Sequence, residues 1–306
     1  MNLSSTVSEL CVMTQVMLDR QPTRLHPRHS RVAVLREARY ADHAQPAGLV
    51  EVLRSAGHEV TVVDPQAVGP GRRQHRLRDV VNSADVMVAR GRSDAVLAVL
   101  RAAAEVGVPV LDPAEAVARV RDKVAMAKVL RRAGVPTPAT FIAPTEMLAA
   151  RVPPAAYPLI LKPVFGDNAE GLKLVMSQRE LRLLNWPDRI ALAQSHIPGD
   201  GVDLKVYAIG NHLTAVHKPS PINPCALAGA RPADLDDRLA NLARTCGRLF
   251  GLSLYGVDCL DTSNGPVVVE INDFPNFTAV PDANRLLADH VLTAAHAQAR
   301  KGGASA

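Results

Sequence analysis

The chain has 306 residues, a net charge of +5, 47% hydrophobic residues and 21% charged residues. At roughly 150 residues per domain, this length allows about two domains or three small ones, and the apolar share excludes general disorder. No apolar run approaches the ~18 residues of a membrane-spanning helix, and the first thirty residues lack the apolar block of a secretion signal. Four scattered cysteines form no CxxC pair, so we expect no disulfide framework or cysteine zinc site, and a cytoplasmic location.

Basic residues are spread along the chain, and residues 70–78 form their only dense cluster. No aromatic residues are interleaved there, whereas surfaces that stack on bases combine basic and aromatic side chains. The cluster therefore favours a solvated helix face, and we expect no nucleic-acid partner.

Residues 1–30 form an amino-terminal extension in which only residues 7–19 suit a helix. From residue 31 strands and helices alternate, which predicts βαβ units and a parallel sheet in a domain over 31–120. The predicted strands are 31–37, 59–65, 85–90 and 108–111, and the predicted helices are 46–56, 72–82 and 94–106. Ligands bind beyond the carboxyl ends of such strands, where the sequence places Arg36, Arg90 and Arg92. These are candidate substrate contacts, although loop salt bridges would explain them equally well.

A different pattern follows two helices at 113–120 and 122–133, the second of which ends at Gly134 before Pro136. The remaining chain predicts mostly antiparallel strands in an α+β arrangement, which we divide into a central lobe, 121–192, and a carboxy-terminal lobe, 193–306. The strands are 157–163 with 172–177, then 190–194, 203–210, 212–219 and 253–261 with 266–273, and helices fit 235–250 and 284–298.

The loop between the first two of these strands contains Gly166, Asn168 and Gly171. It nearly matches the phosphate-binding pattern GxxxxGK, but Leu172 separates the second glycine from the lysine, and a strand follows instead of a helix. The loop is either a plain hairpin turn or a flexible cover whose backbone N–H groups bind phosphates.

The hairpin of 253–261 and 266–273 carries the sharpest signal. A turn centred on Asn264 places Asp258 directly opposite Glu270, and Asn272 on the same strand face. Facing carboxylates repel each other, and a divalent cation removes that conflict. Hard oxygen ligands of this kind suit Mg²⁺, so the hairpin predicts a magnesium site, unless one carboxylate points to solvent.

Lysine is scarce in this chain, which holds most of its positive charge on arginine. Lys162 ends an apolar strand beside the glycine loop, and a desolvated ammonium there requires an anion such as a nucleotide phosphate. Lys123, early in its helix, is by itself no more than a surface charge. No HExxH, GxSxG or nucleophilic cysteine pattern is present.

In this order the segments resemble the ATP-grasp superfamily. The stretches that carry the resemblance are DKVAMAKVLRRAGVPTPAT (122–140), YPLILKPVFGDNAEGLKLV (157–175), AQSHIPGDGVDLKVYAIG (193–210) and YGVDCL with VVVEINDFP (255–275). The resemblance implies an ATP-grasp fold, in which two α+β lobes grip ATP behind an amino-terminal α/β domain. It also implies an enzyme that uses ATP and two Mg²⁺ ions, with Mn²⁺ able to substitute.

The resemblance also implies roles for individual residues. Phosphate contacts fall to Lys123 and Lys162, with the loop carrying Gly166, Asn168 and Gly171 above them. The adenine hinge would run from Gln194 to Ile197, and the ribose partner is Asp200 or Asp203. The metal ligands would be Asp258, Glu270 and Asn272. Lys162, Lys205 and Lys218 are assigned to catalysis, and His217 and Lys218 join the three arginines as substrate contacts.

Two branches of the superfamily compete for the function. Arg90 after a strand, VPVLDPAEAV before DK, and Glu270 as metal residue resemble the ribosomal-protein glutamate ligases. These join a carboxylate to an amine through an acylphosphate, on an amino acid, peptide or small metabolite. Lys205 and the turn NDFPNF instead resemble the inositol polyphosphate kinases of the superfamily, which usually have aspartate where Glu270 stands.

We take the ligase as the main prediction and the kinase as the alternative. A nucleotide-binding protein without catalysis is the third hypothesis, against which the intact lysine and metal residues argue. The resemblance does not fix the oligomeric state, and the protein could form a homo-oligomer.

Overall fold

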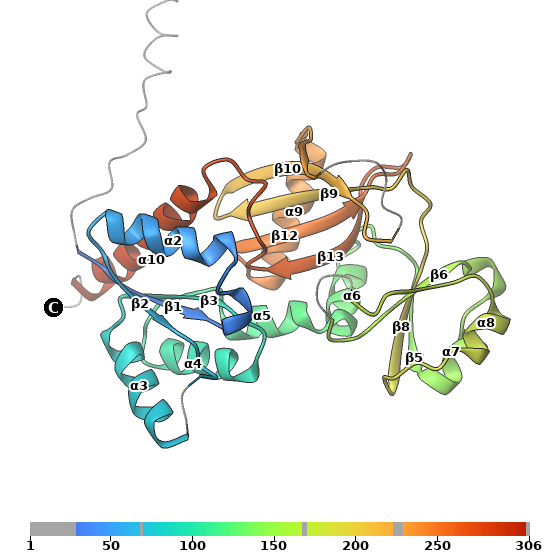
Figure 1. The fold of residues 1–306 in the computed structure, drawn as a ribbon. Coiled ribbons are helices and arrows are strands. Elements are labelled where there is room, and N and C mark those ends of the chain that lie inside the picture. The colour runs from blue at the N-terminus through green and yellow to red at the C-terminus, as the bar shows by residue number, and fades with distance from the viewer. Residues whose placement is uncertain (1–28, 68–69, 167–169, 223–228, 304–306) are drawn as a thin grey trace, which may run out of the picture.

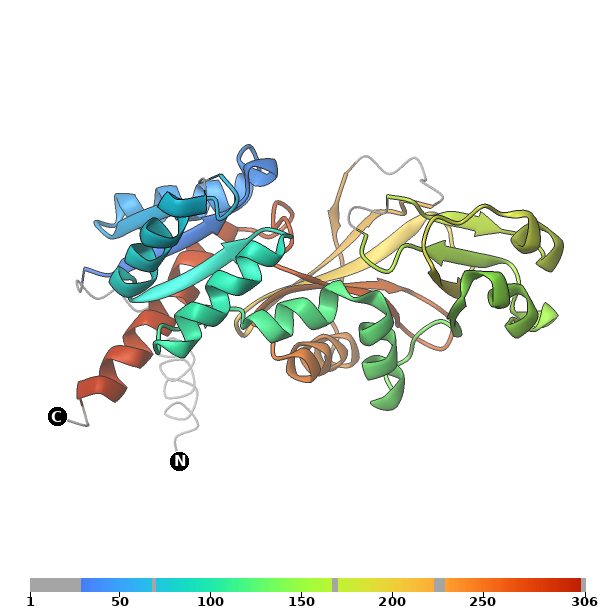
Figure 2. The same ribbon diagram turned by 90° about the horizontal axis from the view of Figure 1, so that it is seen from below.

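The computed structural model of the chain describes residues 29–67, 70–166, 170–222 and 229–303. The predicted helix at 7–19 and Asn168 lie outside these residues. The described chain forms three parts in a row: the amino-terminal domain, a central antiparallel sheet, and a smaller lobe at the opposite end (Figures 1 and 2). No helix in the described ranges is long and apolar enough to cross a membrane.

The amino-terminal domain is built on a parallel sheet in the order β2-β1-β3-β4. Runs of valine, leucine and alanine bury both faces of this sheet, as is typical of parallel strands between helices. Helix α2 and the carboxy-terminal α10 pack on one face, and α3, α4 and α5 pack on the other. The elements are β1 (Arg31–Arg36), η1 (Ala38–Tyr40), α2 (Ala44–Ser55), β2 (Glu59–Val63), α3 (Pro70–Ser83), β3 (Val86–Arg90), α4 (Asp94–Glu105), β4 (Val110–Leu111), α5 (Ala114–Arg121) and α10 (Ala283–Gly303).

A five-stranded antiparallel sheet in the order β11-β10-β9-β12-β13 forms the middle of the molecule. Its strands are β9 (Val202–Ile209), β10 (His212–Pro219), β11 (Arg231–Pro232), β12 (Leu254–Leu260) and β13 (Val267–Asp273). One face packs on α6 (Lys123–Arg132) and α9 (Asp237–Phe250), which lie with α5 along its underside (Figure 2). The opposite face packs on α10 at one end and carries polar side chains at the other.

The third part is a four-stranded antiparallel sheet in the order β5-β8-β6-β7. It comprises β5 (Thr140–Pro144), α7 (Thr145–Arg151), η2 (Pro154–Ala156), β6 (Leu159–Lys162), β7 (Lys173–Val175), α8 (Gln178–Leu183) and β8 (Ile190–Ser195). Helices α7 and α8 cover the face that carries Leu159 and Leu161. Side chains alternate along a strand, so Ile160 and Lys162 point to the other face, toward the central sheet.

The predicted strands and helices of the described residues are present, with ends shifted by a few residues. Sequence patterns missed β5, α7, α8 and the two-residue β11, which are short and, around residues 136–158, interrupted by prolines that break periodicity. The boundary drawn at 192/193 falls inside β8, and α10 packs on α2 of the amino-terminal domain. The domain limits therefore stay a prediction.

Candidate active site

A cavity of about 690 Å³ lies where the three parts meet. The two antiparallel sheets supply most of its wall, and the loops after β1 and β3 close one end. One end of the cavity is lined by β6 and β8 and the other by the amino-terminal domain.

The predicted pair of carboxylates is present on β12 and β13. Asp258 is the cross-strand partner of Glu270, as a turn centred on Asn264 predicts. Asn272 Nδ2 donates to Asp258 Oδ2 at 2.6 Å. Nearer the turn the register shifts by one residue, so that Cys259 pairs with Val268. The bulge leaves Val269 unpaired, so that Val269 and Glu270 both line the cavity while Val268 is buried in the core on the other face of the sheet.

Three lysines surround these carboxylates. Lys205 is the partner of Asp258 on its other side, from β9, with Nζ 2.8 Å from Oδ1. Lys123, the first residue of α6, donates to Glu270. Lys162 approaches from the opposite lobe at the end of β6. Three ammonium groups against two carboxylates leave a local formal charge of +1, which suits a polyanion.

Burial and neighbouring charges shift the pKa of two of these lysines, Lys162 and Lys205. Burial lowers the pKa of Lys162 to about 8, although the charge of Glu270 opposes the shift. Burial also acts to lower the pKa of Lys205, but the charges of Asp258, Tyr207 and Glu270 and the hydrogen bond to Asp258 together outweigh burial, so the pKa lies above the usual value. A buried ammonium with a lowered pKa is stabilised by an anion, so Lys162 is suited to hold a phosphate.

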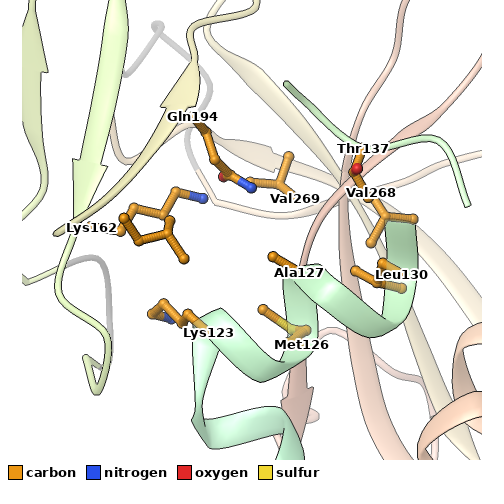
Figure 3. Close-up of a pocket in the computed structure, with 10 residues that line it drawn as sticks. Lys123, Met126, Ala127, Leu130, Thr137, Lys162, Gln194, Val268 and Val269 are labelled. Carbon is orange, nitrogen blue, oxygen red and sulfur yellow. The ribbon is translucent and has the colours of Figure 1, made fainter. Parts of the chain in front are cut away.

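Lys162 and Gln194 project from neighbouring strands over the first turns of α6, where Lys123 begins the helix (Figure 3). Gln194 is held in place by a hydrogen bond from Nε2 to Thr140 Oγ1 at 3.2 Å. Ile197 also lines the cavity. Apolar side chains complete this end of the wall, as a flat base requires: Ile160, Leu172, Leu260 and Val269.

The described residues at the two ends of the glycine loop line this end of the cavity: Gly166, Glu170 and Leu172. Gly171, which ends the loop, has a φ of +74°. A Cβ at position 171 would lie 2.9 Å from Pro163 Cγ, so this turn requires glycine.

Asp203 and Lys218 are cross-strand partners on β9 and β10, on the cavity face. Burial raises the pKa of Asp203, and burial together with Lys205 lowers the pKa of Lys218. Asp200, the alternative to Asp203 as ribose partner, does not line the cavity, and its Oδ1 accepts from the Val202 amide. The pKa shifts of Asp203 and Lys218 indicate that these two side chains share a poorly hydrated part of the cavity wall.

The far end of the cavity is cationic. Arg90 and Arg92 line it, with His43 beside them. The Arg90 guanidinium lies 4.5 Å from the centre of the Tyr40 ring and 5.8 Å from that of Phe274, within cation–π range.

The structure does not bring Arg36 and His217 to the cavity wall. His217 pairs with the buried Leu204, so alternation directs it away from Lys218 to the opposite face of the sheet. Sequence reasoning missed Arg121, whose buried ion pair with Asp273 joins residues far apart in the chain, and no local pattern signals it.

The donor set fits a hard divalent cation, because two carboxylates and a carboxamide oxygen are ligands that Mg²⁺ accepts. Across the described part of the chain, no group of three or more His, Cys, Asp and Glu side chains could hold a metal ion. The candidate site therefore consists of Asp258, Glu270 and Asn272, and a bound nucleotide would have to complete the coordination.

Comparison with known proteins assigns this chain to a family. Residues 120–294 match the RimK-like ATP-grasp domain, which is more than half of the chain. The chain belongs to the RimK-like ATP-grasp family. The predicted ATP-grasp fold and the predicted resemblance are both confirmed.

Individual relatives agree with this assignment. A probable alpha-L-glutamate ligase of Thioalkalivibrio sulfidiphilus is 27% identical over 259 residues, which cover 77% of this chain and 85% of the relative. The RimK domain ATP-grasp protein of Sphaerobacter thermophilus superposes with a TM-score of 0.63 at 23% identity, over 86% of this chain and all of that one. D-alanine–D-alanine ligase of Bacillus anthracis superposes with a TM-score of 0.67 at 15% identity, over 90% of this chain and all of that one.

Proposed function

We propose that this chain joins a carboxylate to an amine at the expense of ATP, on an amino acid, a peptide or a small metabolite. The chain is an ATP-dependent ligase of the ATP-grasp type, and its family uses ATP with a divalent metal. The observation that carries the proposal is the facing pair of Asp258 and Glu270, with Lys123, Lys162 and Lys205 around it in one cavity.

The reaction has two steps in this proposal. A substrate carboxylate oxygen attacks the γ-phosphorus of ATP, the bond to the β-phosphate oxygen breaks, and ADP leaves. The amine nitrogen then attacks the acyl carbon of the acylphosphate, phosphate leaves, and the nitrogen loses a proton. No protein nucleophile is required, which agrees with the absence of a nucleophile motif in the sequence.

The chain's own residues bind, orient and exclude water. Lys123 and Lys162 would neutralise phosphate oxygens, and Gln194, Ile197 and Asp203 would hold the nucleoside. Asp258, Glu270 and Asn272 would hold two Mg²⁺ ions, or Mn²⁺ in their place, which supply charge neutralisation at the phosphates. Apolar walls and the glycine loop would keep water from the acylphosphate.

Arg90, Arg92, Lys205 and Lys218 would contact the acid and orient it toward the γ-phosphate. Lys205, which lies beside Asp258, would contact the γ-phosphate as well. Their positive charges support an anionic substrate, as does the name of the glutamate ligase relatives. A structural neighbour, PsnB, has been solved with a precursor peptide, at 19% identity and a TM-score of 0.63, so this fold can accept a peptide.

Two measurements test the proposal. ADP release and product mass are recorded with MgATP and a panel of amino acids and dipeptides, and separately with inositol phosphates. Amide formation supports the ligase, whereas phosphoryl transfer to an inositol phosphate without any amine supports the kinase.

The metal assignment is tested by substitution. Glu270→Gln and Asp258→Asn should each abolish turnover, and Asp261→Asn, beyond the end of β12, should not. Turnover with an unchanged Mg²⁺ requirement in both site variants would refute the metal assignment.

A further inference from the structure

Arg121 connects three walls of the cavity although it does not line the cavity itself. Its Nη2 lies 2.8 Å from Asp273 Oδ2 and its Nε 3.3 Å from Asp273 Oδ1, so the pair is bidentate. The same Nη2 donates to the Gly91 carbonyl. Both side chains are nine-tenths buried, at 8% and 10% exposure, and two parallel bonds fix their geometry.

Each contact of Arg121 adjoins a residue of the proposed site. Asp273 follows Asn272, the proposed metal ligand on β13, and Gly91 stands between Arg90 and Arg92 at the cationic end. Arg121 itself ends α5, two residues before Lys123.

The segment from Arg121 to Lys123 also reaches the third wall. The Lys123 amide donates to the Val164 carbonyl at 3.2 Å, just beyond Lys162 and Pro163. The Asp122 carboxylate accepts from the amides of Val124 and Ala125 at 2.9 Å and so fixes where α6 begins. Through Arg121 and Lys123, this three-residue segment thus contacts β13, the turn after β3 and the segment just beyond Lys162.

The turn after β3 is held from a second side by Glu37. This buried carboxylate accepts from the Arg92 amide at 2.9 Å and from the Ser93 amide at 2.7 Å. Between Glu37 and Arg121, the backbone that presents Arg90 and Arg92 has its position fixed relative to the carboxylates on β12 and β13.

We propose that Arg121 is a positioning residue that sets the distance between the acid-binding arginines and the phosphoryl-transfer site. The inference rests on the proposed function. We call the contacts of Arg121 with Asp273 and Gly91 the Arg121 tie. Without the tie, the end of the cavity that binds the acid would shift relative to the end that binds ATP. The acid would then be misplaced relative to the γ-phosphate, while the nucleotide end would be unchanged. Misplacement of this kind lowers the rate steeply, because the reacting atoms no longer start in line.

The first experiment tests the tie without any substrate. Amide hydrogen exchange is measured on the full chain for peptides that cover residues 90–93 and 272–276. Arg121→Met should exchange faster in both, Arg121→Lys less so, and Arg101→Met, which removes the exposed Arg101–Glu115 pair, not at all. The double variant Arg121→Met/Asp273→Asn avoids an unpaired buried charge and keeps the test open should the single variant fail to fold. Unchanged exchange at 90–93 would overturn the proposal.

The second experiment separates positioning from a structural role. With the amino acid or dipeptide that gives the most amide in the wild type, kcat/KM for that acid should fall about 10- to 100-fold in Arg121→Met. The KM for ATP should change less than about twofold, and ADP released per amide formed should rise. Arg121→Lys should recover part of the loss. Parallel losses for acid and ATP would mean a structural role and overturn the proposal.

A wild type that forms no amide with any compound would refute the proposed function. The tie would then be judged by exchange together with MgATP affinity, measured by calorimetry. Faster exchange at 90–93 with unchanged MgATP affinity supports the positioning role of Arg121. Faster exchange together with weaker MgATP binding refutes this role.

Discussion

Lys205 and Asp258 face each other on β9 and β12, with Lys205 Nζ 2.8 Å from Asp258 Oδ1. The proposed metal ligand is thus already neutralised by a lysine of the chain. Glu270 is neutralised in the same way by Lys123. A divalent cation therefore competes with an ammonium group for each carboxylate, and the phosphates of ATP would receive the displaced lysines.

This competition predicts opposite effects of one substitution. Lys205→Met removes a positive charge beside Asp258, so Mn²⁺ should bind the nucleotide-free protein about tenfold more tightly. ATP should bind about tenfold more weakly, because the same charge is lost to the phosphates. A tenfold change is modest against the ~4 kcal/mol of two unit charges 4 Å apart at an effective dielectric constant of 20.

Electron paramagnetic resonance titration with Mn²⁺ and fluorescence titration with an ATP analogue measure the two affinities. Lys128→Met, on the exposed face of α6, is the matched control and should change neither. If the two affinities of Lys205→Met fall together, Lys205 does not compete with the metal.

Sequence reasoning found the parts of this site that depend on local spacing. A hairpin fixes which residues face each other, so Asp258 and Glu270 could be paired by arithmetic alone. The same rule of alternation, applied to β10, would have separated His217 from Lys218, since neighbours on a strand point to opposite faces. The pair of Arg121 and Asp273 could not be found in this way, because its register depends on how three parts of the chain pack together.

Lys162 predicts a pH dependence of ATP binding. Its pKa is lowered by burial from 10.5 to about 8, so the ammonium form is dominant at pH 7 and lost as the pH rises through 8. Only the ammonium form attracts a phosphate. The Kd for MgATP should therefore increase between pH 7 and 9, by isothermal titration calorimetry at constant ionic strength. Lys162→Met should bind weakly with a flat profile, and a flat profile in the wild type would contradict the assignment.

Asp112 predicts a pH dependence of stability. Its carboxylate accepts from the Ser253 amide at 2.8 Å, Ser253 Oγ at 2.6 Å and the Leu254 amide at 3.0 Å, and so fixes the start of β12. Burial nonetheless raises its pKa from 3.8 to about 6. The folded state thus takes up a proton more readily than the unfolded state. The stability that this provides is fully present below 3.8, the pKa of the unfolded carboxyl, and is lost as the pH rises from there through about 6. The loss is about 3 kcal/mol from this shift.

Asp112→Asn removes this titration, so the two proteins are compared by urea unfolding between pH 4 and 8. The free energy of unfolding of the wild type, minus that of Asp112→Asn, should decrease as the pH rises. His290, whose Nε2 lies 2.9 Å from Ser253 Oγ, is present in both proteins and contributes little to the difference. A constant difference would show that Asp112 is ionised throughout.

Gly256 predicts a loss of activity from the smallest possible change. It lies on β12 between Tyr207 and Asn272, and a Cβ there would be 2.9 Å from Lys205 Cε and 3.3 Å from Pro275 Cγ. Gly256→Ala should push the Lys205 side chain away from Asp258. Because a flexible side chain can yield, the loss of stability should be about 1 kcal/mol, while turnover should fall about tenfold or more. Lys205→Met has no ammonium group that could be displaced from Asp258, so in this background Gly256→Ala should lower turnover no further. An equal additional loss in that background would mean that Gly256 acts through Pro275 instead.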